Sequence, residues 1–337
     1  LISGCNASSN LNHGIYLRNS TNNTLISNNA TSSSSGGIVI NSYSSNNTLI
    51  GNNATSNTGS GIYILAFSNN NTLLRNNATT NSVSGQAIYI YNSSYMNLTE
   101  NKATSTSSSG IYIEESSDNN TLTSNNGTSY AADNFGIVLG TSSNNILINN
   151  TGMNVNNGIG IYVAGSSNNN TLINNTGISS IGQGIYLFSN YNNTFINQRA
   201  SGNLGIFMVN VNWTTFRDCI DISGTTFDVN LFSTPLSKNN TFINCSYDSE
   251  TVGGTDNELI RKWYYQAYVN DSSGSAVSDA NVSAYNATGV LQSTAQTNAS
   301  GWIARQEVTE YVNNAGTRSY YNNYSIFANK SGYTNDS

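Results

Sequence analysis

The chain alternates short apolar blocks with polar turns at a regular interval. The block Gly-Ile-Tyr-Leu at residues 14–17 recurs, with small changes, about every 24 residues. In each copy two aliphatic residues flank one residue that is usually aromatic. The copies begin at Gly14, Gly37, Gly61, Ala87, Gly110, Gly136, Gly160, Gly184 and Gly205. Alternation of this kind places the two aliphatic side chains on one face of a strand and the aromatic ring on the other.

Two further blocks complete each repeat. About ten residues after the first block comes Asn-Thr-Leu-Ile or a close variant, followed by Asn-Ala-Thr at residues 29–31, 53–55 and 77–79. The central apolar position of the second block holds Leu25, Leu49, Leu73, Leu98, Leu122, Leu147, Leu172, Phe195, Phe216 and Phe242. Each block is rich in strand-forming residues and bounded by Ser, Asn and Gly, so we predict three short strands per repeat and no helix.

Short strands that recur in this way indicate a solenoid in which each coil pairs with the next. We therefore predict an all-β fold, a parallel β-helix of about ten 24-residue coils. At about 4.8 Å per coil the rod is on the order of 50 Å long. Its interior holds the Ile and Leu pairs, and the turn asparagines form amide ladders along the axis.

These motifs resemble the right-handed parallel β-helix repeat of NosD-like proteins, which are surface proteins of archaeal type. The resemblance covers residues 1–247 and implies a right-handed helix on an exported protein. Copper binding, which is attributed to some relatives, is not expected here, because His13 is the only histidine and the three methionines are scattered.

The repeat is lost after Asp248. Residues 248–258 are predicted to be a linker, since Gly and Thr cluster there. Residues 259–337 show strand and turn signals at the spacing of a β-sandwich. This segment resembles the small Ig-like, carboxypeptidase-regulatory-type domain that often follows such helices, and we expect it to act as a spacer or packing module.

Composition narrows the functional classes. Only 8% of the residues are charged and the net charge is -6, with no basic run, which excludes a nucleic-acid partner. No stretch is apolar enough for a membrane span. The chain starts at Leu1 rather than Met, so we expect a processed chain or part of a longer one.

Side chains with catalytic chemistry are sparse. The one acidic cluster in residues 1–216 is Glu114, Glu115 and Asp118, and we interpret it as a solvated turn rather than as a general acid or a cation site. We predict no catalytic residue, no cofactor and no metal site. The remaining candidates, all interpreted as turn, surface or capping residues, are His13, Asp218, Asp221 and Asp228.

The aromatic residues of the first block are predicted to form an outward stripe along one sheet. Such a stripe suits packing against another protomer or against glycans, although a solvated ladder is an equal alternative. The stripe consists of Tyr16, Tyr63, Tyr89, Tyr112, Tyr162, Tyr186 and Phe207.

The sequence contains about 26 Asn-X-Ser/Thr sequons, a number that the Asn-Asn-Thr repeat partly inflates. On an exported chain we expect several to carry glycans. The candidates are Asn22, Asn29, Asn46, Asn53, Asn70, Asn77, Asn119, Asn126, Asn149, Asn169, Asn192, Asn212, Asn239, Asn244, Asn270, Asn281, Asn286, Asn298, Asn323 and Asn329.

Two of the three cysteines occupy equivalent places in adjacent coils. Cys219 and Cys245 each follow the second-block aromatic by three residues, so we predict a disulfide between them. Cys5 lies at the other end of the rod, where an intermolecular bridge and a free thiol remain alternatives.

Leu1 and Ile2 fall where the second strand of a coil is expected, which leaves strand edges unpaired at this end. We expect axial stacking on another subunit. Together with the low charge, these features predict an extracellular structural subunit of a sheath, S-layer or filament, whose partners are copies of itself and possibly cell-envelope glycans. A carbohydrate-binding adhesin and, less favoured, a polysaccharide lyase or hydrolase are the alternatives.

Overall fold

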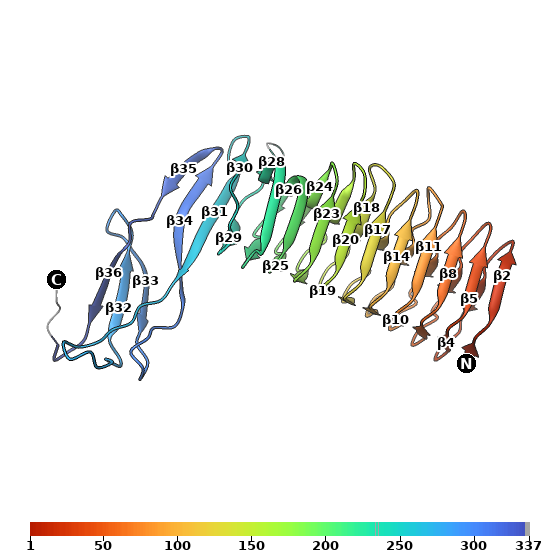
Figure 1. Ribbon diagram of the computed structural model, residues 1–337, viewed down its shortest axis with the longest axis horizontal. Helices are drawn as coiled ribbons and strands as arrows, with labels where there is room; N and C mark the ends of the chain where they lie inside the picture. Colours follow the sequence, from red (N-terminus) through yellow and green to blue (C-terminus); the bar gives the residue numbers. More distant parts are fainter. Residues whose placement is uncertain (233, 235, 334–337) are drawn as a thin grey trace.

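The computed structural model of the chain describes residues 1–232, 234 and 236–333. It is an all-β, right-handed β-solenoid of about ten coils of about 24 residues, with a few antiparallel strands at the C-terminal end. The coils stack along the long axis of a gently curved rod (Figure 1). Among the described residues there is no helix long and apolar enough to cross a membrane.

The second-block strands form one column of a 14-stranded sheet and pair in parallel, with Leu25 opposite Leu49 and Leu49 opposite Leu73. The column consists of β1 (Ile2–Ser3), β4 (Thr24–Ile26), β7 (Thr48–Ile50), β10 (Thr72–Leu74), β13 (Asn97–Thr99), β16 (Thr121–Thr123), β19 (Ile146–Ile148), β22 (Thr171–Ile173), β25 (Thr194–Ile196), β27 (Thr215–Arg217) and β29 (Asn240–Ile243).

The other two blocks form two columns of a 19-stranded sheet, which β26 and β28 join because each runs through both columns. The third-block column consists of β2 (Asn6–Asn10), β5 (Asn29–Ser32), β8 (Asn53–Ser56), β11 (Asn77–Thr80), β14 (Lys102–Ser105), β17 (Asn126–Ser129), β20 (Thr151–Asn154) and β23 (Thr176–Ser179). The first-block column consists of β3 (Ile15–Arg18), β6 (Ile38–Asn41), β9 (Ile62–Leu65), β12 (Ile88–Tyr91), β15 (Ile111–Glu114), β18 (Phe135–Gly140), β21 (Ile159–Ala164), β24 (Gln183–Tyr191), β26 (Arg199–Asn212), β28 (Asp221–Leu231) and β30 (Glu250–Val252).

The predicted alternation of faces is confirmed. Ile62 and Ile64 are fully buried in the core, whereas Tyr63 between them lies half-buried on the outer face. Close packing between coils favours the glycine before most of these strands, a place that Ala87 takes in one coil. A Cβ on Gly160 would lie 2.3 Å from the backbone nitrogen of Ile178, so no larger residue fits without a shift of the backbone.

Buried amides connect the coils in the predicted ladders. We call one of them the inner asparagine ladder: Asn28, Asn52, Asn76, Asn101, Asn125, Asn150 and Asn175. In a typical step the Oδ1 of Asn125 accepts both the backbone N–H and the Nδ2–H of Asn101, at 2.9 Å each. The Nδ2 of Asn125 also donates to the carbonyl oxygen of Leu98 at 2.9 Å. The ladder therefore satisfies polar groups inside the rod that water does not reach.

The prediction of a linker at residues 248–258 is wrong. Within it, β30 pairs in parallel with β28, and β31 (Glu258–Tyr265) continues the column of β29. Val252 and Leu259 are buried in the same core as the earlier coils. The 24-residue period is lost because the turns change length, while strand pairing continues.

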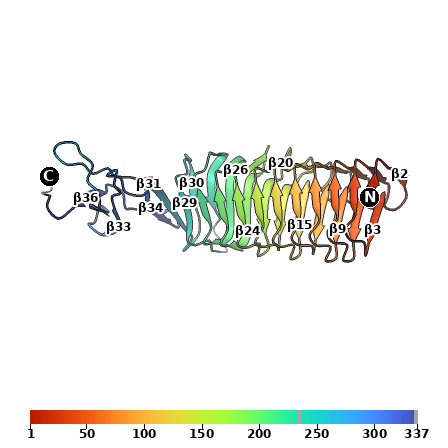
Figure 2. The same ribbon diagram turned by 90° about the horizontal axis from the view of Figure 1, so that it is seen from below.

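Beyond β31 the 14-stranded sheet continues with antiparallel strands, β34 (Gln306–Asn314) and β35 (Thr317–Tyr320). A separate sheet has the order β33 (Leu291–Gln296), β32 (Asn281–Tyr285) and β36 (Ser325–Asn329). Figure 2 shows these strands extending past the last coils. The Ig-like resemblance of this segment stays a prediction.

Candidate functional site

The aromatic stripe divides into two stacks on the outer face of the first-block column. Val39 and Val138 occupy the aromatic position in their coils and interrupt the row. The first stack is Tyr63, Tyr89 and Tyr112, with ring centroids 4.9 and 5.6 Å apart. The second stack is Phe135, Tyr162, Tyr186 and Phe207, with centroids 4.8 to 5.0 Å apart.

The prediction of one continuous stripe is therefore corrected to two separate stacks. Tyr16 stands apart, with its ring 4.5 Å from that of His13. Rings in the stacks cover one another and are only half-exposed. Both valines could be identified in the sequence as departures from the aromatic pattern, and they lie where the row of rings is interrupted.

Glu114 lies beside the first stack. Its carboxylate accepts hydrogen bonds from the hydroxyl of Tyr89 at 2.5 Å and from that of Tyr112 at 3.3 Å. Burial and then this carboxylate raise the pKa values of both tyrosines, because the phenolate form is poorly solvated there and repelled by Glu114. In the second stack, burial raises the pKa of Tyr162 to about 12.

These shifts predict an alkaline limit to stability. Tyrosine in an unfolded chain titrates near pH 10. A folded-state pKa above that value contributes stability that is complete below about pH 10 and is lost as the pH rises through the folded pKa. Urea unfolding at pH 9 and pH 11.5 should show a lower midpoint at the higher pH.

The substitution Glu114→Gln should lower the pKa of Tyr89 and Tyr112 and leave Tyr162, which does not contact Glu114, as the internal control. Titration followed by absorbance at 295 nm measures both effects. Tyrosines that all titrate near pH 10 in the folded wild-type protein contradict this account.

The acidic trio does not converge on one site. Glu114 faces the first stack, Glu115 is exposed in a turn, and the carboxylate of Asp118 accepts the backbone N–H of Ser143 at 2.6 Å. Among the described residues no group of three His, Cys, Asp or Glu side chains is placed to hold a metal ion.

The other ionisable candidates serve turns and coil junctions. Buried Asp228 accepts backbone N–H groups of Gly224 and Asp248 at 2.8 and 2.7 Å. Asp218 accepts from Asn244 Nδ2 at 2.7 Å, and Asp221 is exposed. His13 Nδ1 lies 2.9 Å from the hydroxyl of Ser35, and partial burial lowers its pKa.

The sequence interpretation missed a second set of aromatic residues, which lie in the polar turns that follow the first-block strands. We call them the turn aromatics: Tyr43, Phe67, Tyr95 and Trp213. Phe188 and Tyr191 are also exposed but lie within β24. Tyr43 is 66% exposed and its ring stacks on that of Phe67, with centroids 5.7 Å apart. The sequence feature that could have identified them is an aromatic residue inside a Ser- and Asn-rich turn, where no side chain is needed to fill the core.

Sequon asparagines are distinct from ladder asparagines. In the Asn-Asn-Thr sequences the first asparagine is exposed, and the second is buried in every copy after Asn23, as for Asn46 and Asn47. Among the predicted glycosylation candidates only Asn212 and Asn286 are not exposed. Asn286 is buried, and its Oδ1 accepts the N–H of Val290 at 2.8 Å.

The structure joins Cys219 and Cys245 by a disulfide, with Cα atoms 4.6 Å apart in adjacent coils. Cys5 is exposed and carries a free thiol.

Comparison with known proteins agrees with this architecture. Residues 1–152 match the family model described as a right handed beta helix region. A search of curated protein sequences returns no match.

Three solved structures are similar at low identity. The A-module of the Azotobacter vinelandii mannuronan C-5 epimerase AlgE6 is 14% identical over 75% of this chain and 76% of its own, with a TM-score of 0.42. The A-module of the AlgE4 epimerase from the same organism is 12% identical over 75% of this chain and 77% of its own, with a TM-score of 0.41. ORF18 of Geobacillus virus E2 is 13% identical over 90% of this chain and 68% of its own, with a TM-score of 0.37. Similarity at this level does not extend to activity. By its strand pairing and register the chain has a right-handed parallel β-helix fold, and the family model matches residues 1–152 of it.

Proposed function

We propose that the protein is a structural subunit of an extracellular cell-surface assembly, such as a sheath, an S-layer or a filament. It associates with copies of itself, is N-glycosylated and acts by assembly rather than by catalytic turnover.

The observation that carries the proposal is the continuity of bonding along the rod. Backbone pairing runs from β1 through β29, and the inner asparagine ladder adds buried side-chain bonds from Asn28 to Asn175. The interior is filled by aliphatic and aromatic side chains with almost no exposure. A rod in which every coil is fixed to the next suits a mechanical role.

The outer surface supports an exported role. Charged residues are 8% of the chain, so solubility depends on neutral amides and hydroxyls. Most sequon asparagines are exposed, and glycans attached to them would supply hydration where charge is absent. The disulfide between Cys219 and Cys245 suits an oxidising compartment.

Turn aromatics supply the lateral contact in this proposal. Tyr43 and Phe67 form a stacked, exposed pair on adjacent coils, and rigid aromatic side chains give contact area at low entropic cost. End-to-end pairing of β-helices is a second proposed contact.

The double substitution Tyr43→Ser/Phe67→Ser should raise the concentration needed for assembly by about tenfold or more, equivalent to about 1.4 kcal/mol. Light scattering measures assembly, and circular dichroism checks that the fold is unchanged. Tyr130→Ser, which removes an exposed ring from a different turn, is the matched control. Equal assembly by all three proteins contradicts a role for these rings.

A polysaccharide-directed function is the second candidate, because the Glu114 carboxylate accepts hydrogen bonds from two stacked tyrosines on an outer face. Saccharide turnover that is lost in Glu114→Gln favours this candidate. Retention of assembly by the same variant, with no turnover in the wild type, favours the structural role.

A further inference from the structure

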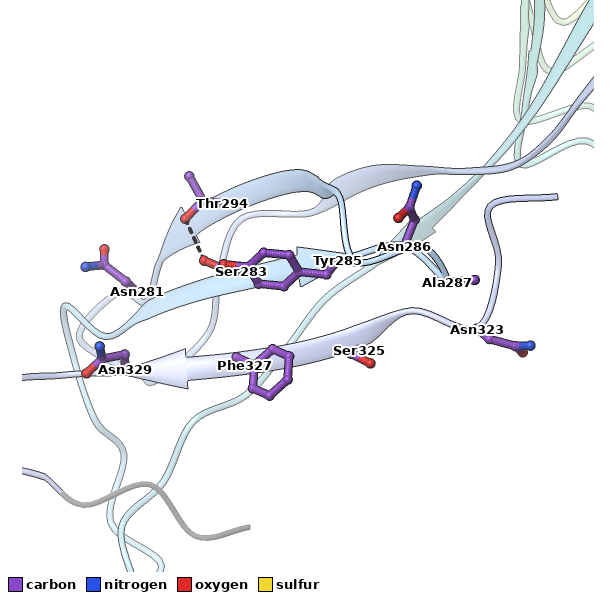
Figure 3. Close-up of a pocket in the computed structure, with 11 residues that line it drawn as sticks. Asn281, Ser283, Tyr285, Asn286, Ala287, Thr294, Asn323, Ser325, Phe327 and Asn329 are labelled. Atoms are coloured by element: carbon purple, nitrogen blue, oxygen red, sulfur yellow. Dashed lines mark hydrogen bonds between the residues drawn. The ribbon is translucent and has the colours of Figure 1, made fainter. Parts of the chain in front are cut away.

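The outer face of the β33-β32-β36 sheet forms a shallow hollow of about 1110 Å³ (Figure 3). Tyr285 and Phe327 lie on this face with ring centroids 5.7 Å apart, and Phe327 is 58% exposed. Amides and hydroxyls surround the rings, and none of the 11 lining residues is charged. Aromatic rings beside neutral hydrogen-bonding groups match an uncharged sugar, which has both apolar C–H faces and hydroxyl groups.

Strand register shows where such a sugar is attached. Asn329 follows Phe327 by two residues on the same strand face, a distance of about 7 Å along β36. Asn329-Lys330-Ser331 is a sequon. A glycan on Asn329 therefore begins at the rim of the hollow, within reach of the exposed ring.

We propose that Asn329 carries an N-linked glycan whose first sugar packs against Phe327 and Tyr285 in this hollow. The inference rests on the glycosylation included in the proposed function. The donor is an oligosaccharide joined to a lipid phosphate, used by an oligosaccharyltransferase. Nδ2 of Asn329 attacks the anomeric carbon, the bond from that carbon to the phosphate oxygen breaks, the lipid phosphate leaves with the electron pair, and the amide loses one proton to a base.

Asn281 is the competing acceptor, since it lies directly opposite Asn329 on the same face. It begins the central strand, and the hydroxyl of its sequon, on Ser283, lies within the strand 3.3 Å from the hydroxyl of Thr294. Asn329 instead ends the edge strand, and Ser331 is exposed beyond it. Side chains directly opposite one another are about 5 Å apart, too close for two glycans. The geometry therefore favours Asn329.

The test uses the full chain produced in a host that performs N-glycosylation and in a host without an oligosaccharyltransferase. Glycopeptide mass spectrometry should find Asn329 occupied in the wild type and in Asn281→Gln, and find Asn281 unoccupied in both the wild type and Asn329→Gln. An unoccupied Asn329 on a chain whose other exposed sequons are occupied overturns the site, while the glycoprotein part of the proposed function stands.

Thermal unfolding tests the packing. For protein from the glycosylating host, adding Asn329→Gln to the wild type should lower the Tm by a few degrees. Adding the same substitution to the Phe327→Ala variant should lower the Tm by less than half as much. Tyr333→Ala, which removes an exposed ring outside the hollow, should behave as the wild type. Without glycosylation the Asn329→Gln effect should vanish in every background.

If Asn329→Gln lowers the Tm equally in the wild type and in the Phe327→Ala variant, the proposed packing of the sugar against Phe327 is overturned. A chain without glycan at any sequon overturns both this inference and the glycosylation in the proposed function. Assembly of the same samples, followed by light scattering, reports separately on the structural role.

Discussion

Replacing Asn125 with leucine should destabilise the β-helix by about 4 kcal/mol, because it interrupts the inner asparagine ladder between Asn101 and Asn150. The substitution leaves the buried backbone N–H of Asn101 and the carbonyl oxygen of Leu98 without the Asn125 amide. Each buried polar group left unpaired costs about 1–3 kcal/mol. Leucine is similar in size, so the loss reports on hydrogen bonding rather than on an empty cavity.

The neighbouring residue provides the control. Asn126 is exposed, and Asn126→Leu should change stability by no more than about 0.5 kcal/mol. Equilibrium unfolding in guanidinium chloride measures both variants. Equal effects from the two substitutions contradict the importance of the ladder.

Replacing Glu250 with alanine should cost about 3–5 kcal/mol, because it removes the acceptor of the buried donors on Tyr247, Tyr311 and Asn313. Each buried polar group left unpaired costs about 1–3 kcal/mol. The Glu250 side chain is fully buried where the last coil meets the antiparallel strands. It accepts hydrogen bonds from the hydroxyls of Tyr247 and Tyr311, at 2.6 and 2.7 Å. Asn313 Nδ2 and Arg318 Nε donate to it at 2.8 and 3.0 Å.

The matched control is Glu307→Ala. Glu307 pairs with Arg217 at 2.7 Å on the same part of the molecule, but its side chain is 32% exposed, so its loss should cost no more than about 1 kcal/mol. Hydrogen exchange should show that Glu250→Ala opens β34 and β35 first. Similar exchange in these strands for the two variants contradicts the role assigned to Glu250.

Periodic features of this protein were predictable from the sequence. Ile62, Tyr63 and Ile64 alternate between core and surface as the pattern requires. The strand at the N-terminal end also pairs with β4, although Ile2 rather than Leu1 lies opposite Leu25, one residue off the expected register. Because the same alternation of apolar and polar positions recurs in each coil, an exception in one coil does not change the interpretation of the whole repeat. The fold class follows from that recurrence.

Features without a period were not predictable in the same way. Three of the partners of Glu250, at Tyr311, Asn313 and Arg318, lie 61 to 68 residues away, and no local pattern connects them. The continuation of the helix through Val252 and Leu259 was missed because the turns there change length. At the candidate site, two stacks instead of one stripe follow from Val39 and Val138, and the exposure of Tyr43 and Phe67 depends on turn geometry.

Electron cryomicroscopy of the concentrated, purified full chain distinguishes a structural subunit from an enzyme. The proposed structural role predicts ordered polymers or sheets in which rods contact one another through the turn aromatics or through the ends of the helix. A population of single rods at every concentration, together with turnover of an added polysaccharide, would contradict it.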